Sequence, residues 1–258
     1  MQPRFQVVDL GDSQLATATW GTGTPRIVFL HDGLGSISQW RSVPGDIAER
    51  LDCSVLAYDR AGHGSSVPSP TTVRPADWLH SEAEVLRDLL DALHIDQPIL
   101  VGHSDGATIA LIYGAQNAAT RGVVAIAAHS WVERAAVDRI IEMRADPEPV
   151  VKGLARHHAD PQALFDSWSG TWSSAPFQLW DTRAILDTLD APTLVAQGAD
   201  DEFATDEQVH ATAAAIGSNA TPLLIPGQPH LIHHESPQVV VDLVVDFVRS
   251  LEADHLDT

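Results

Sequence analysis

Residues 98–116, PILVGHSDGATIALIYGAQ, decide the fold of this chain. The apolar run that ends at Val101 predicts a strand buried on both faces, and the segment from Asp105 onward predicts a helix. Between them, Gly102 to Gly106 match the pattern G-x-S-x-G. In that pattern a serine occupies a sharp strand-to-helix turn, where flanking glycines avoid collisions and the helix N-terminus favours negative charge. We therefore expect Ser104 to be a nucleophile at the carboxyl edge of a sheet.

Similar short apolar runs occur on both sides of this stretch, and longer amphipathic segments separate them. This alternation predicts an α/β fold with a mostly parallel sheet. The strand candidates are FQVVDL and QLATATW, which form an opening hairpin, and then RIVFLHDG, CSVLAYD, PILVGHS, GVVAIAAHS, PTLVAQG and ATPLLIPG. The helix candidates outside the region 131–190 are residues 38–51, 76–94, the segment after Ser104, a helix near 205–216, and 236–251.

The alternation of strand and helix patterns stops between Ser130 and about Asp190, where no strand pattern occurs. This region holds four of the seven tryptophans, which are Trp131, Trp168, Trp172 and Trp180. We expect residues 131–190 to form a helical cap inserted after strand six, between two parts of a core domain at 1–130 and 191–258. In that interpretation Trp131, Glu133, Trp168 and Trp172 contact the substrate. Alternatively, these are ordinary packing helices with tryptophans in a small core of their own.

A serine is a weak nucleophile without a neighbouring base. Three histidines follow the last strand, and His230 is the preferred base because it comes three residues after Gly227. We expect His233 and His234 to be structural. His233 follows His230 with the chelating spacing H-x-x-H, but no helix is predicted under it and no third ligand is evident, so no metal is expected.

The base needs a carboxylate that fixes its tautomer and stabilises the imidazolium. Asp200 and Asp201 follow a buried strand directly, and Asp201 is preferred because it lies three residues past Gly198. The remaining requirement is a pair of backbone N–H groups that stabilise the oxyanion. We expect them at Asp105, which follows the nucleophile, and at Leu34 in the glycine-containing loop LHDGLGS, with Gly33 as the next candidate.

Together these motifs resemble those of the α/β-hydrolase superfamily over nearly the full chain. YDRAGHGSS at 58–66 is similar to that family's Asp-x-Arg-Gly-x-Gly-x-Ser turn, with Ala61 in place of a glycine. HDGLGSISQW is similar to its oxyanion loop, with Asp32 where histidine is usual, and the order Ser…Asp…His is also the family's. The resemblance implies an eight-stranded sheet with helices on both faces, a helical cap, a Ser104–His230–Asp201 triad and no cofactor.

The resemblance leaves the reaction open among several types. Family members with serine at the position of Ser104 cleave esters, lactones, thioesters or the carbon–carbon bonds of ring-cleavage products. The aspartate before Gly33, Asp32, resembles the residue found there in lactone-cleaving members. We expect hydrolysis of an ester or lactone. The alternatives are a carbon–carbon bond hydrolase, a cofactor-free perhydrolase or lyase, and a receptor that only binds its ligand.

Composition narrows the class of partner. The chain has 35 acidic against 15 basic residues and a net charge of −20, which disfavours nucleic acid. No apolar run is long enough to span a bilayer, and the N-terminus does not have the pattern of a signal peptide. Cys53 is the single cysteine, so no disulfide can form within the chain. We expect a cytoplasmic enzyme with a small, fairly apolar substrate and no nucleic-acid or membrane partner; the sequence does not indicate an oligomeric state.

Overall fold

A computed structural model describes residues 1–68 and 73–253. Its centre is a sheet of eight strands in the order β1-β2-β4-β3-β5-β6-β7-β8. The strands are β1 (Arg4–Asp9), β2 (Gln14–Trp20), β3 (Ile27–Leu30), β4 (Val55–Tyr58), β5 (Ile99–His103), β6 (Gly122–Ile126), β7 (Thr193–Gly198) and β8 (Ala220–Ile225). Strand β2 runs antiparallel to both of its neighbours, and β3 to β8 are all parallel. The predicted opening hairpin and the mostly parallel sheet are confirmed.

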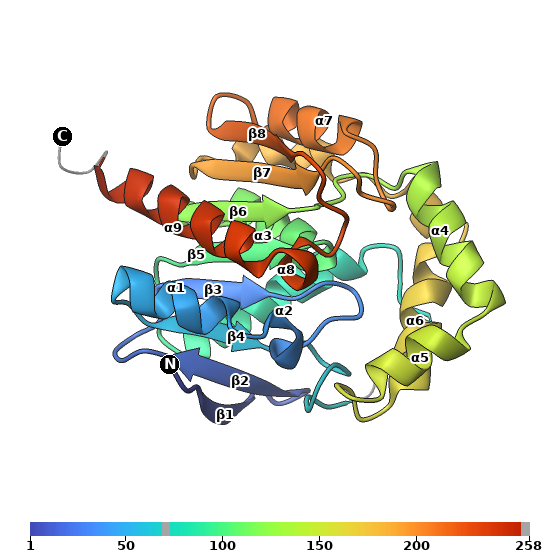
Figure 1. The fold of residues 1–258 in the computed structure, drawn as a ribbon, viewed down its shortest axis with the longest axis horizontal. Coiled ribbons are helices and arrows are strands. Elements are labelled where there is room, and N and C mark those ends of the chain that lie inside the picture. The colour runs from blue at the N-terminus through green and yellow to red at the C-terminus, as the bar shows by residue number, and fades with distance from the viewer. Residues whose placement is uncertain (69–72, 254–258) are drawn as a thin grey trace.

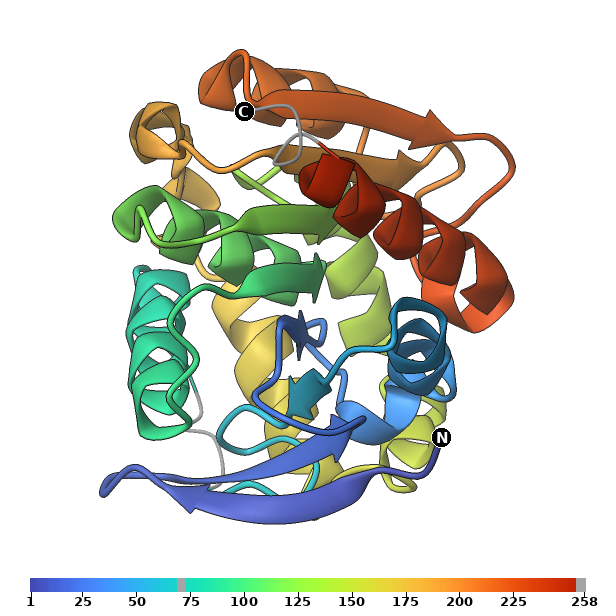
Figure 2. The same ribbon diagram turned by 90° about the vertical axis from the view of Figure 1, so that its left-hand side faces the viewer.

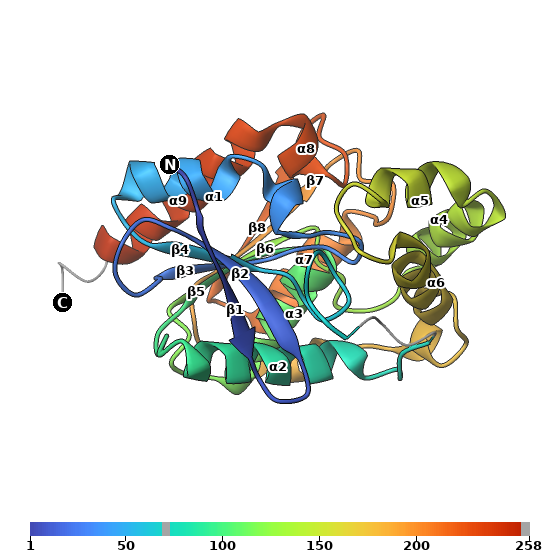
Figure 3. The same ribbon diagram turned by 90° about the horizontal axis from the view of Figure 1, so that it is seen from below.

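Helices cover both faces of this sheet (Figures 2 and 3). They are α1 (Val43–Leu51), α2 (Trp78–Ala92), α3 (Asp105–Gln116), α4 (Arg134–Ala145), α5 (Glu148–Leu154), α6 (Pro161–Trp172), α7 (Glu207–Ile216), α8 (Ile232–Glu235) and α9 (Pro237–Ala253), with short 3-10 turns at Ile37–Trp40, Phe177–Leu179 and Arg183–Thr188. Helices α1 and α9 pack together on one face, and α2 and α3 on the other (Figure 3).

The buried strands divide their side chains between two apolar cores. Along β4, Val55 and Ala57 belong to the core under α1 and α9, whereas Leu56 and Tyr58 belong to the core under α2 and α3. This alternation follows from the two-residue period of a strand. It explains why the central strands are continuous apolar runs, since neither face meets solvent.

One predicted helix differs from the structure. The segment 38–51 is not one helix but a 3-10 turn at Ile37–Trp40 followed by α1. Arg41 separates them at φ 54°, a left-handed conformation that a helix does not contain. The break lets Trp40 turn into the core against Phe29, with ring centroids 4.9 Å apart.

Helices α4, α5 and α6 lie between β6 and β7 in the chain and stand beyond the carboxyl ends of the parallel strands (Figure 1). The loops that leave β3, β5, β7 and β8 reach the same edge of the sheet. Residues that are remote in the sequence therefore meet under these helices.

Candidate active site

Ser104 forms the turn between β5 and α3. Its backbone has φ 52° and ψ −120°, a conformation that is costly for any residue with a side chain. A Cβ atom on Gly102 would collide with the backbone of Gly106, and one on Gly106 would collide with the carbonyl group of Leu30. The two glycines of the motif therefore permit the close packing that presents the Ser104 hydroxyl at the N-terminus of α3.

His230 and Asp201 come together from the loops after β8 and β7. The His230 Nδ1 atom lies 3.0 Å from Oδ1 and 2.9 Å from Oδ2 of Asp201. Burial raises the pKa of Asp201, but the His230 ring outweighs this effect and the net pKa lies below its usual value. Burial lowers the pKa of His230, yet the Asp201 carboxylate holds the net pKa above its usual value. The pair thus stabilises an imidazolium at residue 230.

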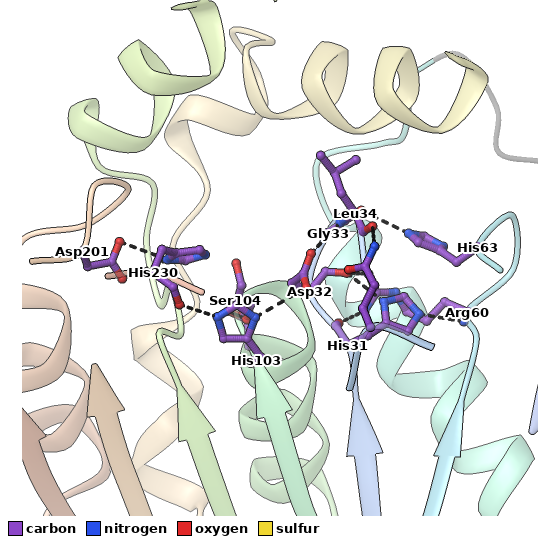
Figure 4. Close-up of polar contacts among 12 residues, drawn as sticks. His31, Asp32, Gly33, Leu34, Arg60, His63, His103, Ser104, Asp201 and His230 are labelled. Atoms are coloured by element: carbon purple, nitrogen blue, oxygen red, sulfur yellow. Dashed lines mark hydrogen bonds and ion pairs between the residues drawn. The ribbon is translucent and has the colours of Figure 1, made fainter. Parts of the chain in front are cut away.

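The His230 ring lies between Asp201 and Ser104 (Figure 4). Because Nδ1 faces the carboxylate, the other ring nitrogen is left for the serine side. Within the described residues no hydrogen bond joins the Ser104 hydroxyl to this ring. Hydrogen bonds of this kind are often long in ligand-free sites and shorten when substrate binds.

The main chain of His230 forms hydrogen bonds with two side chains, those of Glu202 and His103, for which the sequence indicated no role. Its N–H donates to Oε2 of Glu202 at 3.1 Å, and its carbonyl accepts from Nε2 of His103 at 2.8 Å. The Phe203 ring packs on the imidazole, with centroids 4.7 Å apart. Glu202 and Phe203 directly follow Asp201, so the loop that carries Asp201 also positions His230.

The backbone N–H groups near Ser104 that have no hydrogen-bond partner among the described residues include those of Asp105 and Gly33. The Leu34 N–H, which was the expected second donor, instead donates to Oδ1 of Asp32 at 2.9 Å. The physical reason is the side chain at residue 32, which folds back on its own loop as aspartate commonly does in turns. Of the two candidates in this loop, Gly33 is therefore the one whose N–H is free, among the described residues, to bind an oxyanion.

The loop that carries Gly33 is held by the turn at 58–66. Arg60 is fully buried, and its guanidinium donates to the carbonyl oxygens of His31 at 2.5 Å and Asp32 at 2.8 Å. The carbonyl oxygen of Gly33 lies 3.1 Å from Nε2 of His63 (Figure 4). The arginine of this turn thus fixes the backbone of the loop beside Ser104.

A pocket of about 410 Å³ lies over Ser104. Ser104, Asp105, His230 and the oxyanion loop form its floor, and α4, α5 and α6 provide most of its walls. Trp168 and Trp172 line it, together with apolar residues that include Ile140, Met143 and Leu154.

Two expected substrate contacts lie outside this pocket lining. The Trp131 ring instead packs under the Arg183 guanidinium, whose central carbon is 4.4 Å from the ring centroid. The Glu133 carboxylate accepts hydrogen bonds from the hydroxyl group of Thr205 at 2.6 Å and from its backbone N–H at 3.2 Å, just before α7. Both residues precede α4 and contact neighbouring segments of the chain instead of lining the pocket.

The pocket lining also includes the buried side chains of Asp105, which was expected to contribute only its backbone N–H, and of His129. Burial raises the pKa of Asp105 to about 6, and its Oδ2 atom has no described partner. Burial, with the nearby charge of His230, lowers the pKa of His129 to about 3. His129 comes at the end of an ordinary apolar strand segment, so nothing in the sequence distinguished it.

None of the helices in the described part of the chain is long and apolar enough to cross a membrane.

Comparison with known proteins agrees with this geometry. The chain is 27% identical to 2-succinyl-6-hydroxy-2,4-cyclohexadiene-1-carboxylate synthase of Salmonella typhimurium, over 88% of this chain and 95% of that protein. It is also 27% identical to the esterase YbfF of Escherichia coli, over 83% of this chain and 89% of that protein. Two other curated relatives are longer, and the chain spans only 27% and 32% of their length.

Among solved structures, the enol-lactonase of Burkholderia xenovorans superposes with a TM-score of 0.73 at 21% identity, covering 95% of this chain and all of that one. At this identity the likeness establishes the fold alone. A family model described as the alpha/beta hydrolase family matches residues 27–243, which is most of the chain. With this match and the eight-stranded sheet, the chain belongs to the alpha/beta hydrolase family.

Proposed function

We propose that this protein is a serine hydrolase that cleaves a carboxylic ester or lactone through an acyl-enzyme. The observation that carries the proposal is the Asp201–His230 pair, 2.9 Å apart, beside a serine at φ 52° on the floor of a pocket. A strained serine at a helix N-terminus, next to an imidazole oriented by a carboxylate, is the arrangement that activates a hydroxyl as a nucleophile.

In the proposed reaction, His230 takes the proton from Ser104 as the hydroxyl attacks the carbonyl carbon. The oxyanion forms against the N–H groups of Asp105 and Gly33, each worth about 3 kcal/mol of barrier in comparable sites. His230 then gives its proton to the leaving oxygen. Water, deprotonated by the same imidazole, releases the acyl group and restores the serine.

The pocket supports a small, largely apolar substrate. Its volume of about 410 Å³ is in the range of ordinary ligand sites. Trp168 and Trp172 present indole surfaces to it, and α4 to α6 separate it from solvent on the side away from the sheet. We propose that residues 131–190 act as the cap that defines which acyl and leaving groups fit, in an enzyme that works on a soluble small molecule.

The experiment is a panel of p-nitrophenyl esters, thioesters and aliphatic lactones with the wild-type chain and Ser104→Ala. Turnover by the wild type that disappears in the variant supports the proposal. A fluorophosphonate that labels Ser104, located by mass spectrometry of the digest, identifies the nucleophile independently of substrate choice. Equal turnover by both proteins, or labelling at another residue, would overturn the assignment.

A second candidate is a hydrolase of carbon–carbon bonds in ring-cleavage products that carry a carboxylate. It is favoured by the guanidinium groups of Arg41, Arg139 and Arg156, which line the pocket of a chain with a net charge of −20. Three further arginines of the region 131–190, which are Arg134, Arg144 and Arg183, lie outside the pocket lining, and Arg134 pairs with Asp138 at 2.7 Å. Faster turnover of a vinylogous diketone acid than of any ester, with a raised KM in Arg139→Ala, would favour this reaction.

A further inference from the structure

Three side chains outside the proposed triad converge beside the nucleophile. Asp32, His103 and His233 each offer one ligand atom, and these atoms all lie within 4.8 Å of one another. The residues are 8%, 0% and 2% exposed. They come from the oxyanion loop, the strand end before Ser104 and helix α8, so the cluster joins the three segments that carry the reacting groups.

The hydrogen bond of the His103 ring shows which of its two nitrogens is available to bind a ligand. Its Nε2 lies 2.8 Å from the carbonyl oxygen of His230, and a carbonyl only accepts, so Nε2 carries a hydrogen. In the neutral ring Nδ1 is then a lone pair. This atom is buried, has no hydrogen-bond partner among the described residues, and lies 3.6 Å from Oδ2 of Asp32 (Figure 4). A lone pair facing a carboxylate requires a positive group between them.

His233 adds a third donor to the same place. Its Nδ1 is also buried without a described partner, and its ring lies 4.6 Å from that of His103 by centroids. A single proton shared by Asp32 and His103 would leave this nitrogen unsatisfied. Unpaired buried polar atoms are costly, so two imidazoles that each have an unpaired buried nitrogen, next to the Asp32 carboxylate, favour a ligand that contacts all three residues.

We propose that Asp32, His103 and His233 bind one divalent transition-metal ion, with Zn²⁺ as the best fit. Two imidazoles and a carboxylate are a known zinc ligand set, in which a water molecule takes the fourth position, with bonds of about 2.0–2.2 Å to the protein ligands. Such bonds in a tetrahedron place neighbouring ligand atoms roughly 3.3 Å apart. The observed 3.6 Å between Nδ1 of His103 and Oδ2 of Asp32 exceeds a hydrogen bond but is close to that edge length.

The surroundings of the cluster match those of a metal site. A ligating histidine usually donates its other N–H to a carbonyl or carboxylate, as His103 does to the His230 carbonyl. A ligating carboxylate is usually hydrogen-bonded itself, as Asp32 is by the Leu34 N–H. No third ligand is evident in the sequence near His230 and His233, because the fold brings Asp32 and His103 to His233 from far along the chain.

In this proposal the ion is structural. It links the loop that carries Asp32, the end of β5 at His103 and helix α8 at His233. The acyl transfer at Ser104 does not involve the ion. Because it would bind the folded chain and not the unfolded one, it should also raise the melting temperature, by an amount that grows with the logarithm of its concentration above Kd.

The test uses the whole chain, treated with a chelator and then titrated with Zn²⁺ by calorimetry and with Co²⁺ by absorption spectroscopy. We expect about one ion per chain, a visible Co²⁺ band and a rise in Tm of several degrees with Zn²⁺. Asp32→Asn and His233→Gln should each weaken binding at least about a hundredfold. His234→Gln is the matched control, since His234 is the neighbouring histidine outside the cluster, and it should bind as the wild type does.

Two results would overturn the proposal: no binding by the wild type, which would mean that the cluster shares a proton instead, or unchanged affinity in His233→Gln. If the variants do not fold, X-ray absorption of the zinc-loaded wild type decides the question. Scattering from two imidazoles and an oxygen supports the site, and its absence refutes it. Neither readout depends on the hydrolase reaction, so the metal site and the proposed function can fail separately.

Discussion

The Nδ1 atom of His230 lies 2.9 Å from Oδ2 of Asp201, although 29 residues separate them in the chain. Strands β7 and β8 pair in parallel up to Gly198 and Ile225, so the loops that leave them start side by side. The pairing of these two strands therefore brings the loops of Asp201 and His230 together, whatever rotamers the two side chains adopt.

Replacement of Ser104 by alanine should lower kcat on a responsive ester by a factor on the order of 10⁴ to 10⁶, because the nucleophile is lost while binding and oxyanion stabilisation remain. The turn keeps its φ of 52° with either residue, so thermal unfolding should be nearly unchanged. Steady-state kinetics and a melting curve check both statements. A variant that keeps most of its activity would exclude Ser104 as the nucleophile.

Replacement of Asp201 by asparagine should lower kcat/KM by about 10⁴-fold, since the imidazole loses the group that fixes its tautomer. It should also move the acid limb of the pH profile to lower pH. A base works only when neutral, and the Asp201 carboxylate is what holds the pKa of His230 above its usual value. Asp200→Asn is the matched control, because Asp200 is exposed and should leave the limb in place. An acid limb that does not move in Asp201→Asn would contradict the pairing.

Replacement of Gly106 by alanine should destabilise the fold by about 2 kcal/mol or more, because the new methyl group would collide with the carbonyl groups of Leu30 and His31. Gly153→Ala is the control: its Cβ would meet nothing within 4 Å, and it lies in α5. That change should leave stability unchanged or raise it by up to about 1 kcal/mol. Urea denaturation measures both, and equal midpoints would show that the nucleophile turn tolerates a side chain.

Replacement of Trp168 by alanine should lower kcat/KM for esters with long apolar acyl groups by roughly tenfold, with less effect on acetyl esters, because it removes an indole from the pocket wall. Trp131→Ala removes the same side chain from a position outside the pocket and serves as the control. A chain-length series on both variants gives the comparison. If Trp131→Ala changed the acyl preference as much as Trp168→Ala, the pocket would be wrongly placed.

Local pattern explains why much of the fold could be predicted. Continuous apolar runs such as 99–101 mark strands that are buried on both faces, and the glycines at 102 and 106 mark a turn that leaves no room for side chains. The break at Arg41 was missed because a left-handed residue inside an amphipathic segment has no composition of its own. What decides that break is the packing of Trp40 under the sheet.

The sequence by itself determined the alternation of strands and helices, the turn at Ser104, and the position of Asp201 and His230 just beyond their strands, because each depends on neighbours within a few residues. Tertiary structure alone decided which side chains face the pocket, that Leu34 donates to Asp32, and that Asp32, His103 and His233 meet. Those contacts depend on the register of strands and the direction of loops, which are set by the whole core and are not encoded in any one segment.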